Sequence, residues 1–151
     1  MLIFLDIDGV MVPAKSWKSP ELHIDGFPVF SSRATIALQQ LIAEGATVML
    51  TTSHKATYGI EEWKSIFKER GIFIESLKSL PANSGHTSRK EELMNWFNSN
   101  TIHEDFIIID DDTSLNDLPG YLKNHLVQTS PHIGLTAEHL EIISVRRLQV
   151  F

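Results

Sequence analysis

Hydrophobic and polar positions alternate in blocks along this chain, and the blocks are of two kinds. Amphipathic stretches with helical spacing separate short apolar runs that are typical of buried strands. Five such runs occur: Leu2–Leu5, Ala46–Thr51, Gly71–Ile74, Asp105–Ile109 and His125–Thr129. This alternation predicts an α/β fold, with a mostly parallel sheet and helices on both of its faces.

Capping residues indicate where the helices begin. Ser31 or Ser32 can cap the first helix, and Ser88, with Glu91 three residues later, can cap the third. The last helix is expected to begin near Thr136. Apolar residues at helical spacing define the inward faces of four helices: Ala34, Leu38, Leu41 and Ile42; Ile60, Trp63 and Phe67; Leu93, Trp96 and Phe97; Leu140 and Ile143.

The segment Met11–Phe30 is too irregular for a strand or a helix. It is rich in proline, lysine and aromatic residues, and we expect it to form a flap over the end of the first strand. Its Lys15, Trp17 and Lys18 are candidates for contacts with a phosphorylated polymer, through charge and stacking. The alternative is a solvated flap with one aromatic side chain packed against the body.

Composition narrows the class of protein. The chain has 151 residues, of which 42% are hydrophobic and 21% charged, which predicts a single globular domain over residues 1–151. Its formal charge of −6 argues against strong nonspecific binding to nucleic acid. Zero cysteines exclude disulfides and thiolate chemistry. The N-terminal apolar run ends at Asp6, which favours a core strand over a signal peptide or a membrane span, so we expect a cytoplasmic protein.

The most informative chemistry follows the first apolar run. Asp6 and Asp8 alternate along an extended chain, so both carboxylates can face one point at the end of the strand. Gly9 then permits a sharp turn. Because open α/β sheets bind ligands at the carboxyl ends of their strands, two acids there indicate a bound cation or a proton-transfer role.

Other polar groups follow later strands. The second apolar run ends in the hydroxyls of Thr51–Ser53, and the fourth is followed by Asp110–Asp112. Arg89 and Lys90 lie near the start of the third helix. If the first, second and fourth strands are neighbours, these groups converge, and oxygen ligands without histidine or cysteine favour Mg²⁺. Carboxylates, Mg²⁺, a hydroxyl and a cation together suit a phosphoryl group.

Three further residues near these motifs have alternative interpretations. Asp112 is expected to be a cap or turn residue rather than a metal ligand. Asp117 is expected to be a solvated acid. His54 follows the hydroxyls of the second strand, and is a candidate for a role facing the substrate.

These motifs resemble those of the haloacid dehalogenase (HAD) superfamily of phosphotransferases. Between Leu2 and Asp112 the chain has an apolar strand with Asp-x-Asp-Gly, an apolar strand with Thr/Ser, a basic residue, and an apolar strand with Asp-Asp, in that order. Within the superfamily it most resembles the small HAD domain of multifunctional (Swiss Army Knife) RNA repair proteins. That likeness rests on Arg89-x-x-Glu92-Leu93-x-x-Trp96, Ile109–Asp112, Gly134–Thr136 and His139-Leu140.

The resemblance implies a three-layer α/β/α sandwich with a Rossmann-like parallel sheet of strand order 5-4-1-2-3. Only Met11–Phe30 separates the first strand from the first helix, and a helix directly follows the second motif. Neither connection could form a large cap domain, so we expect an open site.

The resemblance also implies a covalent mechanism. Asp6 would attack phosphorus to give an aspartyl-phosphate, and Asp8 would protonate the leaving oxygen and later deprotonate water. Mg²⁺ would be held by the Asp6 carboxylate, the Asp8 backbone carbonyl, and Asp110 or Asp111.

Phosphate binding is implied for the hydroxyl and basic motifs. Thr52 would bind a phosphate oxygen, with Thr51 as the alternative and Ser53 beside them. Arg89 or Lys90 would neutralise the phosphate. The superfamily usually has lysine at this motif, whereas the RNA repair pattern points to Arg89.

The sequence therefore predicts a Mg²⁺-dependent phosphatase with a site open to bulky phosphorylated substrates. Nucleotides, nucleic-acid ends and phosphoproteins are the candidate substrates, and no membrane partner is expected. The alternative is a module on the same fold that binds phosphate, Mg²⁺ or a protein partner without turnover. Loss of turnover in Asp6→Asn would favour the enzyme.

Overall fold

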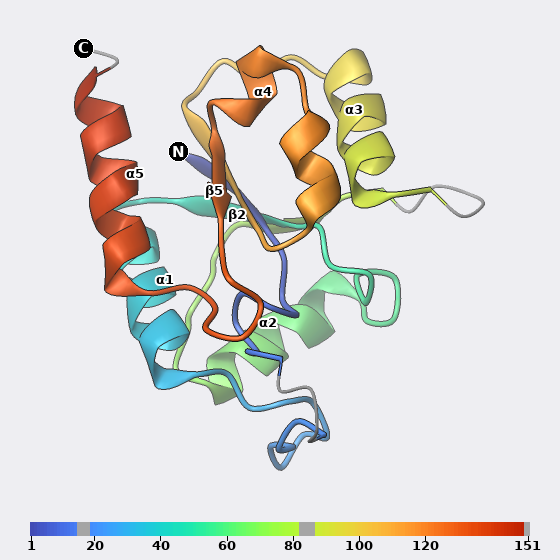
Figure 1. Cartoon of the computed structure of the whole chain (residues 1–151). Helices are drawn as coiled ribbons and strands as arrows, with labels where there is room; N and C mark the ends of the chain where they lie inside the picture. The colour runs from blue at the N-terminus through green and yellow to red at the C-terminus, as the bar shows by residue number, and fades with distance from the viewer. Residues whose placement is uncertain (15–18, 82–86, 150–151) are drawn as a thin grey trace.

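A computed structural model describes residues 1–14, 19–81 and 87–149 (Figure 1). The candidate flap residues Lys15, Trp17 and Lys18 lie outside these ranges. The strands are β1 (Leu2–Leu5), β2 (Thr47–Leu50), β3 (Leu77–Ser79), β4 (Phe106–Asp110) and β5 (Leu126–Gln128). The helices are α1 (Ser32–Ala43), α2 (Ile60–Glu69), α3 (Arg89–Ser99), α4 (Gly120–Lys123) and α5 (Ala137–Gln149), with a short 3₁₀ helix, η1, at Thr113–Asp117.

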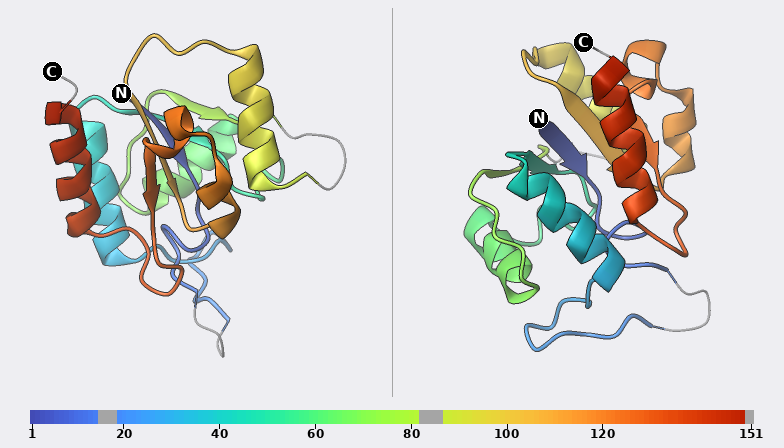
Figure 2. Two further views of the ribbon diagram at one scale, coloured as in Figure 1. Left: turned by 45° about the horizontal axis from the view of Figure 1, so that its top comes forward. Right: turned by 90° about the vertical axis from the view of Figure 1, so that its left-hand side faces the viewer.

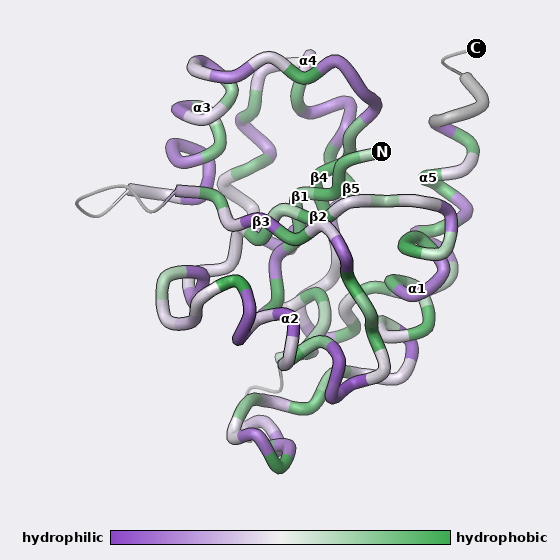
Figure 3. The backbone as a smooth tube through the Cα atoms, turned by 180° about the vertical axis from the view of Figure 1, so that it is seen from behind, coloured by the Kyte–Doolittle hydropathy of each residue, from purple (hydrophilic) through white to green (hydrophobic). Residues whose placement is uncertain are grey.

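The five strands form one parallel sheet in the order β3-β2-β1-β4-β5. This is the predicted order 5-4-1-2-3 counted from the other edge, so the prediction is confirmed. Alternate residues of β1 point to opposite faces. Ile3 and Leu5 pack into the core under α1, α2 and α5, whereas Leu2 and Phe4 pack into a second core with α3, η1 and α4. The sheet is the apolar middle layer between two helical layers (Figures 2 and 3).

The register of the central strands places three polar positions in one row. Leu5 of β1 pairs with Leu50 of β2 and with Ile109 of β4. The ladder continues one step further, because the backbone N–H of Asp6 donates to the carbonyl of Ile109, and the N–H of Thr51 donates to that of Leu5. The residues just past this level, Asp6, Thr51 and Asp110, therefore meet at one edge of the sheet.

One strand prediction is wrong. The apolar run Gly71–Ile74 is not a strand, and the third strand is Leu77–Ser79. Gly71 has a φ of +79° and ends α2, and the N–H of Ile72 donates to the carbonyl of Phe67. Ile72 and Ile74 are buried in the core without pairing to the sheet, so burial alone produced the apolar pattern.

The other elements agree with the sequence more closely. The remaining four strands match the predicted ranges to within one residue at each end. The side chains of Ser31 and Ser88 accept hydrogen bonds from the N–H groups of Ala34 and Glu91, so both predicted caps are confirmed. The short helices η1 and α4 were not predicted. Among the described helices, none combines the length and apolar character that a membrane span requires.

The described part of the flap folds back on itself and docks on α2. Its two arms are joined by backbone hydrogen bonds from His23 to Phe27 and from Val29 to Glu21. Arg70, at the end of α2, donates to the backbone carbonyls of Phe27 and Pro28 and to the carboxylate of Asp25. The Arg70 side chain is only 4% exposed. Arg70 therefore binds the flap through both its backbone and the side chain of Asp25.

Candidate active site

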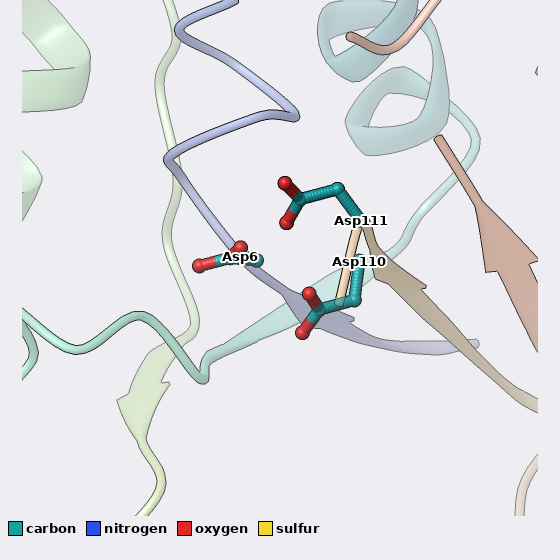
Figure 4. A group of neighbouring side chains, drawn as sticks. All are labelled: Asp6, Asp110 and Asp111. Atoms are coloured by element: carbon teal, nitrogen blue, oxygen red, sulfur yellow. The ribbon is translucent and has the colours of Figure 1, made fainter. Parts of the chain in front are cut away.

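Three carboxylates gather at the carboxyl ends of β1 and β4 (Figure 4). Asp6 directly follows β1, Asp110 ends β4, and Asp111 follows it. One oxygen from each lies within 4.8 Å of the others. Asp6 and Asp110 are buried, and Asp111 is partly exposed. The sequence predicted that these acids would converge, and the strand order explains why they do.

Arg89 at the start of α3 reaches into this cluster. Its Nη1 lies 3.3 Å from Oδ1 of Asp6 and donates to Oδ2 of Asp110 at 2.5 Å. Lys90 makes no ion pair with either acid in the part of the chain that the structure describes. Of the two basic residues that the sequence left open, the fold places Arg89 beside the acids.

The three carboxylates carry more negative charge than the single positive charge of Arg89 neutralises. Burial and the charge of Asp110 together raise the pKa of Asp6 from 3.8 to about 8, against the opposing effect of Arg89. Burial also raises the pKa of Asp110, against the influence of Arg89. Three carboxylates with one guanidinium would leave two uncompensated charges in a buried place. This donor set, made of oxygen atoms and lacking two positive charges, fits a divalent hard cation such as Mg²⁺.

The hydroxyl residues Thr51–Ser53 follow β2 at the same edge of the sheet as Asp6. Thr51 and Thr52 are both fully buried, whereas Ser53 is exposed. Oγ1 of Thr52 accepts a hydrogen bond from the N–H of His54 at 3.3 Å. Oγ1 of Thr51 has no hydrogen-bond partner among the described residues although it is buried, and its backbone is level with Asp6. Either threonine can offer a hydroxyl donor at this edge.

The carboxylate of Asp8 lies outside the three-acid cluster. Its side chain is 57% exposed, and its Oδ2 lies 2.9 Å from Nε2 of His54. The metal contact predicted for Asp8 is made by its backbone carbonyl and not by this carboxylate. Asp6 and Asp8 therefore occupy different environments, one buried among acids and the other near solvent beside a histidine.

The turn after Asp8 is held by the carboxyl end of β5. Oγ1 of Thr129, which is buried, donates to the carbonyl of Gly9 at 2.8 Å. The N–H of Leu135 donates to the carbonyl of Val10. Thr129 was not predicted as part of this region, although it lies at the end of a predicted strand.

Gly9 allows the turn to pass close to Asp111. Its φ is +80°, and a Cβ atom added there would lie 2.1 Å from Oδ2 of Asp111. Gly9→Ala is expected to displace that carboxylate and weaken Mg²⁺ binding at least tenfold, an order-of-magnitude figure for losing one ligand position. Titration of Mg²⁺ binding by calorimetry measures the change.

Gly26 provides the matched control for this prediction. Its φ is +82°, but an added Cβ would meet nothing within 4 Å. Gly26→Ala therefore introduces the same backbone strain, about 1–2 kcal/mol, without an overlap. Equal Mg²⁺ affinity in the two variants would show that contact with Asp111 does not matter.

A buried ion pair supports α3 and was also missed. Nζ of Lys55 lies 2.6 Å from Oε2 of Glu92, with side chains 6% and 12% exposed. Glu92 is one helical turn beyond Arg89, so the pair ties that turn of α3 to the loop after β2. The spacing Arg89-x-x-Glu92 was visible in the sequence, but the partner of Glu92 was not.

The remaining acids near the site have structural roles or face solvent. Oδ1 of Asp112 accepts from the N–H of Ser114 at 2.9 Å and caps η1, which confirms the predicted cap. Asp117 is exposed, as predicted.

A groove of about 480 Å³ opens beside Asp8. Its lining is mostly apolar and comes from the turn after β1 and from the flap: Val12, Pro13, Ala14, Pro20, Val29 and Phe30, with Ser19, Glu21 and Ser31. Asp8 thus borders a hollow large enough for part of a bulky molecule.

Comparisons with known proteins agree with this geometry. A model of the family described as the HAD domain in Swiss Army Knife RNA repair proteins matches residues 2–140. No curated protein matches the chain by sequence. The fold is similar to a crystal structure of D,D-heptose 1.7-bisphosphate phosphatase from B. bronchiseptica, complexed with magnesium and phosphate. That match has a TM-score of 0.51 and 11% identity, and covers 95% of this chain and 98% of the other.

Proposed function

Because this chain belongs to the family of HAD domains found in Swiss Army Knife RNA repair proteins and is an enzyme of the HAD phosphatase type, we propose that it hydrolyses phosphomonoesters through an aspartyl-phosphate on Asp6. The observation that carries this proposal is the meeting of Asp6, Asp110, Asp111 and Arg89 at one edge of the sheet. Such a set of acids with one cation can bind a divalent metal together with a phosphoryl group.

The first half of the proposed reaction uses Asp6 and Asp8. A carboxylate oxygen of Asp6 forms a bond to phosphorus, and the bond from phosphorus to the ester oxygen breaks. Asp8 gives a proton to the departing oxygen, so the product leaves as an alcohol. In the second half, water attacks phosphorus, Asp8 takes its proton, and inorganic phosphate leaves the regenerated Asp6.

Other residues bind and orient in this scheme. Arg89 would balance the charge of the phosphoryl oxygens, and Thr51 or Thr52 would donate a hydrogen bond to one of them. The carboxylates of Asp6 and of Asp110 or Asp111, with the backbone carbonyl of Asp8, would hold Mg²⁺. When bound, Mg²⁺ supplies positive charge that lets Asp6 stay ionised and neutralises charge developing on the phosphoryl group.

A bulky substrate is proposed because the site lies beside an open groove. The apolar groove next to Asp8 is lined by the flap and by the turn after β1, and it could receive the organic part of the ester. The family's association with RNA repair favours a nucleic-acid end or a nucleotide over a phosphoprotein. The net charge of −6 suits binding at one terminal phosphate better than along a polyanion.

Metal dependence gives the first test. Hydrolysis of an aryl phosphate is expected with Mg²⁺ and to fall below about 1% of that rate after EDTA treatment, because uncompensated charge in the site would repel the substrate. Phosphate release over time is the measurement, and re-addition of Mg²⁺ is the control. Oligonucleotides phosphorylated at the 3′ or 5′ end and phosphopeptides then rank the substrate classes by kcat/KM. No release from any of them by folded, Mg²⁺-loaded protein would contradict the proposal and favour a binding module.

A further inference from the structure

His54 and Asp8 form a side-chain pair at the mouth of the site. Nε2 of His54 lies 2.9 Å from Oδ2 of Asp8 although the residues are 46 positions apart in sequence. Both side chains are about half exposed. An exposed carboxylate would ordinarily sample several rotamers, so a partner at this distance restricts where its oxygens lie.

His54 itself is fixed from two directions. Its backbone N–H donates to Oγ1 of Thr52, in the hydroxyl motif. Its ring packs edge-on against Phe27 of the flap, with 6.2 Å between ring centroids. Phe27 is buried, packs on Trp63 of α2, and its carbonyl accepts from Arg70. The backbone of His54 is thus held by the end of the second strand, and its imidazole by the docked flap.

We propose that His54 is a positioning residue that orients the carboxyl of Asp8 for proton transfer to the leaving oxygen. The hydrogen bond engages Oδ2 and leaves Oδ1 to carry the proton. Proton transfer requires hydrogen-bond distance to the ester oxygen, so an unrestrained Asp8 would meet that requirement less often. This inference rests on the proposed phosphatase mechanism.

The role predicts a dependence on the leaving group. A nitrophenolate departs without much help from an acid, whereas unsubstituted phenolate needs a proton more. Removing His54 should therefore lower kcat/KM more for phenyl phosphate than for nitrophenyl phosphate. The ratio kcat/KM is the appropriate quantity, because it covers only the steps up to departure of the alcohol.

The experiment compares wild type, His54→Ala, His54→Gln and Asp8→Asn on a series of substituted phenyl phosphates with Mg²⁺. For His54→Ala we expect a loss of about tenfold on phenyl phosphate and less than about threefold on nitrophenyl phosphate, part of the contribution of a general acid. Asp8→Asn should show the same trend more strongly. His54→Gln, which keeps a nitrogen donor, should recover part of the loss.

His103→Ala is the matched control, because His103 is exposed beside residues at the amino ends of the strands and should leave all rates unchanged. A purely structural role of His54 would lower every substrate equally, and that result, or rates equal to wild type, would overturn the inference. Absence of turnover in wild type would instead contradict the proposed function, and the inference with it.

Discussion

Replacing Asp6 with asparagine is expected to reduce kcat for phosphate-ester hydrolysis by at least about 10⁴-fold, as removal of a nucleophile does in other covalent enzymes. The amide keeps the size of the side chain in its buried place but cannot form the acyl-phosphate bond. Asp117→Asn is the control, because Asp117 is an exposed acid of η1. Steady-state phosphate release measures both, and an Asp6→Asn protein with more than about 1% of wild-type activity would exclude Asp6 as the nucleophile.

The same variant has an expected effect on stability that does not depend on any substrate. The pKa of Asp6 is about 8 in the folded chain against an ordinary 3.8, so the folded state holds a proton that the unfolded state releases. The protonated Asp6 therefore stabilises the folded state fully below about pH 4, and this stabilisation is lost as the pH rises through 8. In metal-free protein, Asp6→Asn should therefore be more stable than wild type at pH 8. Denaturant unfolding at both pH values measures this, and an unchanged difference would contradict the origin of the shift.

Arg89→Ala is expected to lower kcat/KM by about 10²–10³-fold, the range for losing one charged group that stabilises a transition state. Arg89 contacts both Asp6 and Asp110, so phosphoryl oxygens bound at Asp6 would lie near its guanidinium. Arg89→Lys keeps the charge without the planar fork and should retain part of the activity. Kinetics with saturating Mg²⁺ are the measurement, since Mg²⁺ also limits repulsion between the acids.

Lys90→Ala distinguishes the two basic residues that the sequence motif offers. Lys90 is adjacent in sequence but forms no ion pair with Asp6 or Asp110 among the described residues, so its removal should change kcat/KM less than about threefold, as for a charge that is not paired within the site. A large loss in Lys90→Ala with near-normal Arg89→Ala would reverse the assignment. Thermal unfolding of each variant separates a loss of folding from a loss of phosphate binding.

The convergence of the acids could be predicted because it depends on local patterns. Asp6 and Asp110 each end a continuous apolar run, and a parallel sheet brings such ends to one edge. The basic residue followed from the motif and the RNA repair pattern pointed to Arg89, and the position of α3 shows that Arg89 pairs with the acids. The third strand was mistaken because Ile72 and Ile74 are buried outside the sheet, and burial leaves the same apolar pattern as pairing.

Contacts between distant segments could not be predicted from one sequence. The pairs His54–Asp8 and Lys55–Glu92 join residues from different loops and helices. No hydrophobic periodicity in the sequence indicates which residue each of them contacts. The role of Arg70 was not predicted either. Its buried position against the flap depends on the fold of 21–29, a segment without regular secondary structure.

Because Arg70 anchors the flap, the residues that keep the flap folded differ from those that can vary to change substrate specificity. Most of its hydrogen bonds to the flap end on backbone carbonyls, which every residue type provides. The outward side chains of the flap, Leu22 at 60% and Ile24 at 94% exposed, can therefore be exchanged at little cost to folding. The neighbouring flap residues Pro20, Glu21 and Val29 line the groove beside Asp8, so the flap is the segment to randomise when altering which substrates the groove accepts.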